Sequence, residues 1–140
     1  MSDQHWQHFP HDADIGIRGF GQTRSEAFEQ AAKAMIGAIT DPETVAPSEQ
    51  VSINCEAPDD ELLLVDWLNA LVYEMATRKM LFSRFDVSTD GFKLNATAWG
   101  EAVDTEKHRP AVEVKGATHT HLRVHQRPNG DWVAECVVDV

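Results

Sequence analysis

The sequence predicts an α+β fold in which a single, largely antiparallel or mixed β-sheet carries two amphipathic helices on one face. Residues 23–39 and 58–75 repeat apolar side chains at helical spacing. Elsewhere, short runs alternate apolar and polar residues and are separated by turn signals, as half-buried strands do. The second half has no pattern for crossover helices, which parallel strands need, so antiparallel pairing is favoured.

Length and charge limit the classes of protein that fit. The chain has 140 residues, 42% of them hydrophobic, so a single domain over residues 1–140 with its own core is expected. The formal charge of −11 disfavours direct nucleic-acid binding, because an acidic surface repels phosphates. No apolar run approaches the roughly 18 residues that cross a membrane. Met1–His5 lacks the features of a signal peptide, and the expected location is the cytoplasm.

The first half predicts a strand, a helix and another strand. Residues 15–20 form a strand-like run, and Thr23 with Glu26 matches a capping box at the start of the first helix. The apolar stripe of this helix consists of Phe28, Ala31, Ala32, Met35, Ile36 and Ile39. Asp41-Pro42 ends it, because proline disfavours a helical residue before it. Alternation over residues 51–55 predicts a half-buried strand.

The second helix begins where residues 58–61 place acidic side chains, which suit the positive end of a helix dipole. Its main stripe consists of Leu64, Trp67, Leu68, Leu71 and Met75. Five strand-like runs follow, at residues 81–87, 92–99, 112–115, 118–126 and 132–138. Asp90-Gly91 and Asn129-Gly130 are hairpin signals between consecutive runs.

Carboxylates at the two ends of the chain form the first candidate site. Asp139 and the terminal carboxylate of Val140 directly follow a strand-like run, and Asp14 opens the first strand. If these strands are neighbours, three carboxylates gather and repel one another unless a cation bridges them. Oxygen ligands suit Ca²⁺ or Mg²⁺, whereas ordinary solvated acids are the alternative. Asp12, two residues before Asp14, points the same way in an extended segment, and Glu135 is a further acid nearby in sequence.

The histidines and cysteines indicate no zinc site. His119, His121 and His125 fall on the polar face of the predicted strand 118–126, which a wet strand face explains. Cys55 and Cys136 are far apart and belong to no CxxC pair, so buried thiols are expected. Lys115 could bind phosphate, but a lone lysine is usually a solvated charge.

Six parts of the sequence stand out together: residues 11–17 (HDADIGI), 26–28 with 31–32, 62–69 (LLLVDWLN), 100–101 with Asp104, 113–118 (EVKGAT) and 138–140 (VDV). In their order along nearly the whole chain, these segments resemble the archease family. Archeases activate RtcB-type RNA ligases. The resemblance implies one sheet with two helices, in agreement with the fold predicted above.

The resemblance also implies a function. Archeases are not enzymes; they help the partner ligase become guanylylated by GTP and turn over repeatedly in tRNA splicing or RNA repair. Matched to this chain, the family's divalent-metal ligands are Asp14, Asp139 and the terminal carboxylate of Val140, and the lysine that matters for activation is Lys115.

Two positions depart from the family pattern. The family usually has Thr where this chain has Asp12, which adds a charge beside the site; Asp12 is a candidate for a further metal ligand and for a contact in activation. His119 stands where the family favours Tyr. Two other functions stay open: a chaperone or solubility factor for an RNA-modifying enzyme such as a tRNA methyltransferase, and a metal-dependent hydrolase that uses the same carboxylates.

Overall fold

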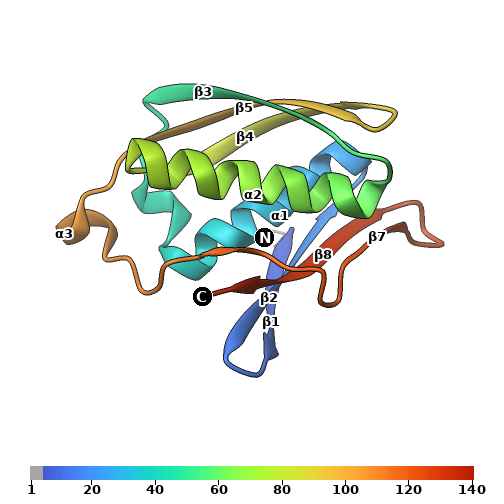
Figure 1. The fold of residues 1–140 in the computed structure, drawn as a ribbon, viewed down its shortest axis with the longest axis horizontal. Coiled ribbons are helices and arrows are strands. Elements are labelled where there is room, and N and C mark those ends of the chain that lie inside the picture. The colour runs from blue at the N-terminus through green and yellow to red at the C-terminus, as the bar shows by residue number, and fades with distance from the viewer. Residues whose placement is uncertain (1–4) are drawn as a thin grey trace.

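The computed structural model describes residues 5–140, which form two antiparallel sheets with two long helices between them (Figure 1). The first sheet contains β1 (Trp6–His11), β2 (Asp14–Gly21), β6 (Gly116–Ala117), β7 (Arg123–Gln126) and β8 (Trp132–Asp139). The second contains β3 (Glu49–Glu56), β4 (Met80–Asp90) and β5 (Lys93–Ala102). The helices are α1 (Arg24–Ile39), α2 (Asp60–Arg78) and the short α3 (Thr105–His108), with one 3-10 turn, η1 (Pro42–Thr44).

Strand β8 is internal to the first sheet. It pairs with β2 along one edge, whereas β6 and β7 share its other edge. In the register with β2, Ile15 lies opposite Val138 and Gly21 lies opposite Trp132. The end of the chain therefore lies beside the beginning of β2, although the two strands are far apart in sequence (Figure 1).

One face of the first sheet packs against α1. Ile17 and Cys136, which are opposite each other, are fully buried on this face. Gly19 shares the face, and a Cβ there would lie 2.2 Å from the backbone nitrogen of Ala31 in α1. Strand and helix backbones thus approach more closely than any larger residue at position 19 would allow. On the opposite face, the ring of Phe9 covers Gly16.

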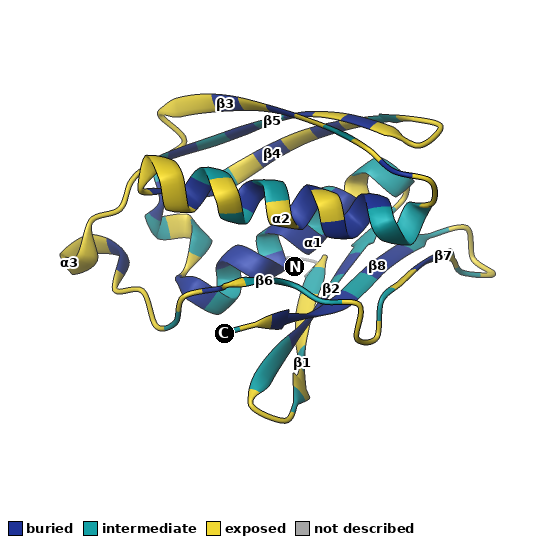
Figure 2. Ribbon diagram, in the orientation of Figure 1, coloured by how far each residue is buried: buried dark blue, intermediate teal, exposed yellow. Residues whose placement is uncertain are grey.

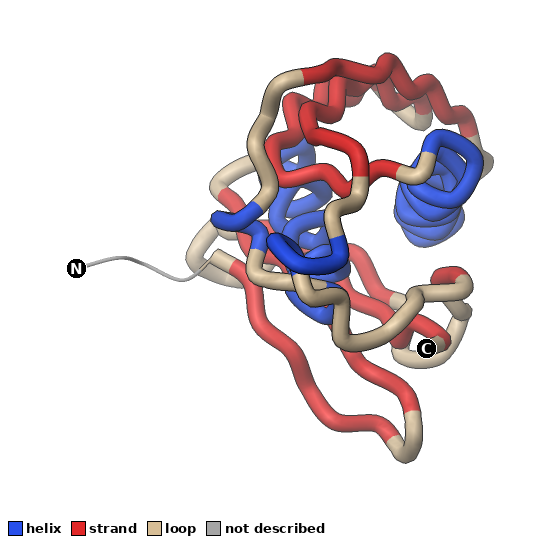
Figure 3. Tube along the Cα trace, turned by 90° about the vertical axis from the view of Figure 1, so that its left-hand side faces the viewer, coloured by secondary structure: helices blue, strands red, loops and turns tan. Residues whose placement is uncertain are grey.

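The second sheet lies on the other side of the helices, as the view in Figure 3 also shows. Its order is β3-β5-β4, with β4 and β5 joined by a tight hairpin in which Asp90 pairs with Lys93. Gly91 occupies the left-handed region at φ 59°, so the Asp90-Gly91 hairpin signal is confirmed. The turn Pro128–Asp131 between β7 and β8 is confirmed as well, with Gly130 at φ 95°.

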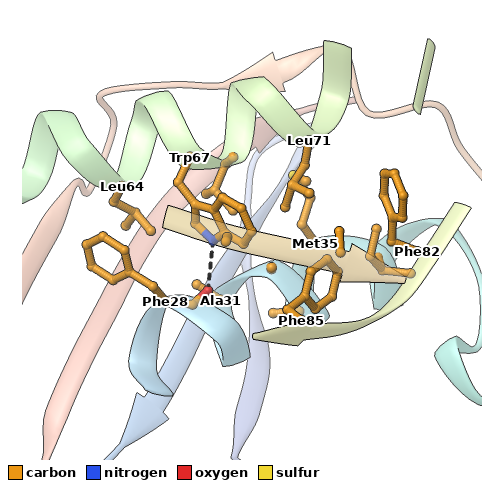
Figure 4. Packing of buried hydrophobic residues seen from close by; sticks show 14 of the residues in the cluster. Phe28, Ala31, Met35, Leu64, Trp67, Leu71, Phe82 and Phe85 are labelled. Atoms are coloured by element: carbon orange, nitrogen blue, oxygen red, sulfur yellow. Dashed lines mark hydrogen bonds between the residues drawn. The ribbon is translucent and has the colours of Figure 1, made fainter. Parts of the chain in front are cut away.

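Both predicted helices are present with their predicted starts. Thr23 Oγ1 accepts the N–H of Glu26 at 3.1 Å, and Asp59 Oδ1 accepts the N–H of Leu62 at 2.8 Å. The predicted stripes face the core, so the helices are yellow only on the sides turned to solvent (Figure 2). Trp67 is fully buried, and its Nε1 donates to the carbonyl of Phe28 at 3.0 Å, which joins α2 to α1 (Figure 4).

The α+β class and the antiparallel pairing are confirmed, but the prediction of a single sheet with both helices on one face is wrong. Strands β3, β4 and β5 pair only among themselves in the described chain, and the helices are covered on two sides. The alternation of a strand shows that one side is buried, but it does not show which strands share a sheet. Two separate sheets, each packed against the helices on one face, therefore give the same alternation in the sequence as one larger sheet.

Smaller differences concern irregular segments. Strand β1 and α3 were not predicted, and residues 112–115 are not a strand. The predicted strand 118–126 is shortened to β7, because residues 119–121 form a bend and turn in which His121 has φ 53°. In residues 5–140, neither long helix is apolar enough over its length to cross a membrane. The prediction for the N-terminus concerns Met1–His5, of which Met1–Gln4 lie outside the described residues.

Candidate functional site

The register of β2 and β8 places two acidic residues opposite each other. Asp14 is the first residue of β2 and Asp139 is the last of β8. One step beyond the pair Ile15–Val138, the register sets Asp14 across from Asp139. Opposite residues of an antiparallel pair project from the same face with Cβ atoms about 5 Å apart, and like charges there repel.

The next residue brings a further carboxyl group to the same place. The backbone N–H of Val140 donates to Asp14 Oδ1 in a long contact of 3.4 Å. Val140 is half-buried and packs against the core, which holds this end of the chain in place. The terminal carboxylate thus belongs to a residue that contacts Asp14 through its N–H and that directly follows Asp139. We call Asp14, Asp139 and the carboxylate of Val140 the carboxylate cluster.

The donor set of the carboxylate cluster fits a hard cation. All its ligand atoms are oxygens, which Ca²⁺ and Mg²⁺ prefer, and a doubly charged ion would offset the repulsion. Within residues 5–140, no three His, Cys, Asp or Glu side chains group as a metal site. The cluster differs from such a group because its third member is a main-chain carboxylate.

Lys115 lies beside the carboxylate cluster through its backbone. Its N–H donates to the carbonyl of Asp139 at 2.8 Å, immediately before β6, and its side chain is exposed. The following segment stays on β8, since the N–H of Thr118 donates to the carbonyl of Val137 at 2.9 Å. The structure thus brings together Asp14, Asp139, Val140 and the backbone of Lys115.

Asp12 is not part of an extended segment with Asp14, so that expectation is wrong. It lies in the two-residue turn between β1 and β2, where His11 pairs with Asp14, and its φ is 51°. Aspartate tolerates this left-handed conformation better than most residues do. Its side chain is 93% exposed at the tip of the hairpin, 4.0 Å from Nδ1 of His11. Asp12 is thus available to a partner surface.

Glu135 lies outside the carboxylate cluster. Its carboxylate accepts from Arg18 Nη2 at 2.9 Å and from Arg18 Nε at 3.3 Å across the β2–β8 pair. Four residues of strand separate it from Asp139, roughly 13 Å. The guanidinium of Arg18 also stacks over the ring of Phe9, 4.7 Å from its centroid. The carboxylate of Glu135 thus pairs with Arg18 on the outer face of the sheet.

The histidines are placed differently from the prediction. His119 and His121 leave the strand, and only His125 lies in β7. The ring of His121 packs against those of Phe9 and His11, with centroids 5.8 Å and 5.2 Å away. A polar strand face therefore does not explain these histidines; an aromatic cluster does, for His11 and His121.

Asn69 is a neighbour of this site to which the sequence assigned no role. Its Oδ1 accepts the N–H of Ala117 at 2.8 Å, which joins α2 to β6. A Cβ added at Gly116 would lie 3.1 Å from the same Oδ1. Asn69 ends the segment 62–69 that resembles archeases, but only the fold shows what its side chain contacts.

An apolar hollow of about 430 Å³ opens on the other side of Lys115. Its walls come from the C-terminal half of α2 and from residues 110–115, and they include Val72, Met75, Val103 and Val112. Val103 is one of the few large apolar side chains that are exposed, at 38%. An apolar surface of this kind is suited to an apolar side chain of a partner.

Both cysteines are free thiols; Cys136 is buried, as predicted, whereas Cys55 is only half-buried. Burial raises the pKa of Cys136 to about 12 and that of Cys55 to about 11. Because the thiolate is the reactive form, neither residue is suited to catalysis or to metal binding in the native fold.

Comparison with known proteins assigns the family. The model of the Archease protein family (MTH1598/TM1083) matches residues 6–140. The chain is 37% identical to Protein archease of Pyrococcus abyssi over 139 residues, covering 96% of this chain and 98% of the relative. It is 33% identical to Protein archease of Methanosarcina barkeri over 147 residues, with both chains fully covered.

Solved structures show the same fold. The solution structure of Methanobacterium thermoautotrophicum protein 1598 matches with a TM-score of 0.86 and 32% identity, covering 99% of this chain and 100% of that one. The crystal structure of a Thermotoga maritima archease, described as a possible chaperone, matches with a TM-score of 0.61 and 18% identity over 94% of each chain. On the family model and the full-length relatives together, the chain belongs to the archease family.

Proposed function

We propose that this protein is a non-enzymatic, cytoplasmic activator of an RtcB-type RNA ligase. In this proposal it promotes guanylylation of the ligase by GTP and its repeated turnover in tRNA splicing or RNA repair. Membership of the archease family supports the proposal, and the observation that carries it is the contact between Val140 and Asp14. This contact supports the proposal because it sets the last residue of the chain, next to Asp139, beside Asp14.

Each group of the site has a physical role in the proposal. Asp14, Asp139 and the carboxylate of Val140 would hold Ca²⁺ or Mg²⁺, which when bound supplies positive charge and open positions for phosphate oxygens. The exposed ammonium of Lys115 binds an anionic phosphate as a point charge. Asp12 contacts the basic surface of the ligase from the hairpin tip. The charge of −11 steers the encounter between the two proteins.

The test is a guanylylation assay with purified partner ligase, labelled GTP and limiting amounts of this protein. Asp14→Ala, Asp139→Ala and Lys115→Ala are each expected to reduce the yield of guanylylated ligase per unit time. Glu56→Ala is the matched control, because Glu56 is an exposed acid on β3 in the other sheet and should leave stimulation unchanged.

Undiminished stimulation by the Asp14→Ala and Asp139→Ala proteins would remove the carboxylate cluster from the function. The isolated protein is also expected to release no phosphate or nucleotide from GTP or from phosphoesters. Turnover of these substrates by the protein alone would instead favour the hydrolase.

The apolar hollow beside Lys115 favours a second candidate, a chaperone that keeps an RNA-modifying enzyme soluble. In that case the protein binds an apolar segment of its partner and does not alter nucleotide chemistry. Light scattering of the partner distinguishes the two functions. Val112→Asp in the hollow should abolish protection against aggregation if this candidate is right, whereas Asp14→Ala should not.

A further inference from the structure

The short strand β6 is held to β8 along one edge only. The N–H of Lys115 donates to Asp139 and that of Thr118 donates to Val137, both on the β8 side. The hydroxyl of Thr118 also donates to the carbonyl of Val137, at 2.8 Å. The N–H of Ala117 instead has its acceptor at the free edge of β6, on the side of α2.

Asn69 occupies that free edge. Its Oδ1 accepts the N–H of Ala117 at 2.8 Å, in an exposed position where water could also accept this bond. The N–H of Ala117 would therefore have a hydrogen-bond acceptor without Asn69, and the contribution of this bond is to fix the position of β6. The anchor is rigid, because the neighbouring residues Trp67 and Leu68 are fully buried in the core.

The contact with Gly116 points to the same arrangement independently. A Cβ at position 116 would approach Oδ1 of Asn69 to 3.1 Å, closer than ordinary van der Waals contact. The Asn69 side chain thus lies directly over Gly116, the residue that follows Lys115. Lys115 is held on one side by Asp139 and, through the next two residues, on the other side by Asn69.

We propose that Asn69 is a positioning residue for Lys115. By holding Ala117 and covering Gly116, it sets the position of the Lys115 ammonium relative to the carboxylate cluster. This inference rests on the proposed function, since it concerns the same site. Asn69 acts through Lys115 and is not itself a ligand or a group that touches the nucleotide.

The experiment titrates full-length protein into partner ligase with GTP and compares Asn69→Ala with the wild type. The maximum stimulation at saturating protein should fall roughly tenfold or more, as expected when a charged group is displaced by about an ångström. The concentration that gives half-maximal stimulation should not change. Partial unfolding would lower the amount of competent protein. It would therefore raise the concentration that gives half-maximal stimulation and leave the maximum stimulation unchanged. Asn95→Ala, on the outer face of the second sheet, is the matched control.

Two further measurements make the result specific. Amide hydrogen exchange should become faster at Ala117 in Asn69→Ala and stay unchanged at Thr118. Asn69→Ala combined with Lys115→Ala should be no worse than Lys115→Ala alone, because one residue acts through the other. A wild-type plateau for Asn69→Ala, an additive loss in the double variant, or unchanged exchange at Ala117 each overturns the proposal.

These outcomes separate this inference from the proposed function. If Lys115→Ala loses stimulation and Asn69→Ala keeps it, only the positioning role fails. If the wild-type protein does not stimulate the ligase, or Lys115→Ala matches it, the proposed role of Lys115 fails and the positioning role fails with it.

Discussion

The backbone N–H of Val140 meets the carboxylate of Asp14 at 3.4 Å, although 126 positions separate them in the chain. The contact exists because β8 runs beside β2 in the register that pairs Ile15 with Val138. Asp14, Asp139 and the last residue of the chain thereby lie at one end of a sheet whose strands come from opposite ends of the chain.

Cation binding should depend on this end of the chain. A peptide tag joined after Val140 converts its carboxylate to an amide, which removes one charged oxygen ligand, and should weaken Ca²⁺ binding. A tag before Met1 should not. Isothermal titration with Ca²⁺ and with Mg²⁺ measures the difference. Equal affinity for the two tagged proteins would show that Val140 is not a ligand.

The close approach of β2 and α1 should make Gly19 intolerant of a side chain. In Gly19→Ala the new Cβ would overlap the backbone of Ala31, so the free energy of unfolding should fall by about 3 kcal/mol. Gly37→Ala is the matched control, because the three atoms nearest to its Cβ all belong to the side chain of Trp6 and not to backbone. Since alanine also favours helix, its stability should stay within about 1 kcal/mol of the wild type. Chemical denaturation measures both; equal stabilities would contradict the close approach.

Glu101 should make the stability of the protein fall in acid. Its carboxylate accepts bonds from Ala46 N–H, Lys107 Nζ and His108 Nε2, at 2.8, 2.7 and 2.9 Å. The bond from Ala46 is the largest cause that lowers the pKa of Glu101 to about 2 in the fold. A lowered pKa stabilises the fold above about pH 4.5, and this contribution is lost as the pH falls toward 2.

Glu101→Gln should therefore flatten the loss of stability between pH 4.5 and 2, while being less stable than the wild type at neutral pH. Thermal melting across this range measures the effect. Glu56→Gln serves as the control, since within residues 5–140 its side chain forms no ion pair. A Glu101→Gln profile parallel to that of the wild type would count against this network.

The thiols should report on opening of the first sheet. Because burial raises the pKa of Cys136 to about 12 and of Cys55 to about 11, both should react slowly with a thiol reagent at pH 8. Cys55 is only half-buried and should react first. Cys136 is buried and should react only when β8 separates from β2. Mass spectrometry of each peptide gives the two rates. Faster labelling of Cys136 would contradict the packing described here.

The sequence predicted the elements whose pattern repeats several times. The apolar stripes that contain Phe28 and Trp67 predicted the two long helices. Gly91 and Gly130 predicted the turns between β4 and β5 and between β7 and β8. Strand β1 has no such signal, because Pro10 interrupts it and its exposed face carries polar residues. Without β1 as a neighbour, Asp12 could not be recognised as a turn residue.

The sequence supplied the residues of the candidate site but not their geometry. Asp14 and Asp139 were candidates from their places beside strand-like runs, and the resemblance to archeases added Lys115, whereas their proximity depends on a strand register that the sequence does not contain. Asn69 could not be recognised at all, because what distinguishes it is a single bond between a helix and an edge strand. Periodicity shows which side of an element is buried and does not show what a polar side chain reaches.

The internal position of β8 has a consequence for how the protein acquires its structure. Strands β1 and β2 and helix α1 are synthesised early, but one edge of β2 has no pairing partner until β8 leaves the ribosome. Long-range pairing of this kind is slow, since a large loop must close first. The nascent chain is therefore most exposed to aggregation just before synthesis of this strand is complete.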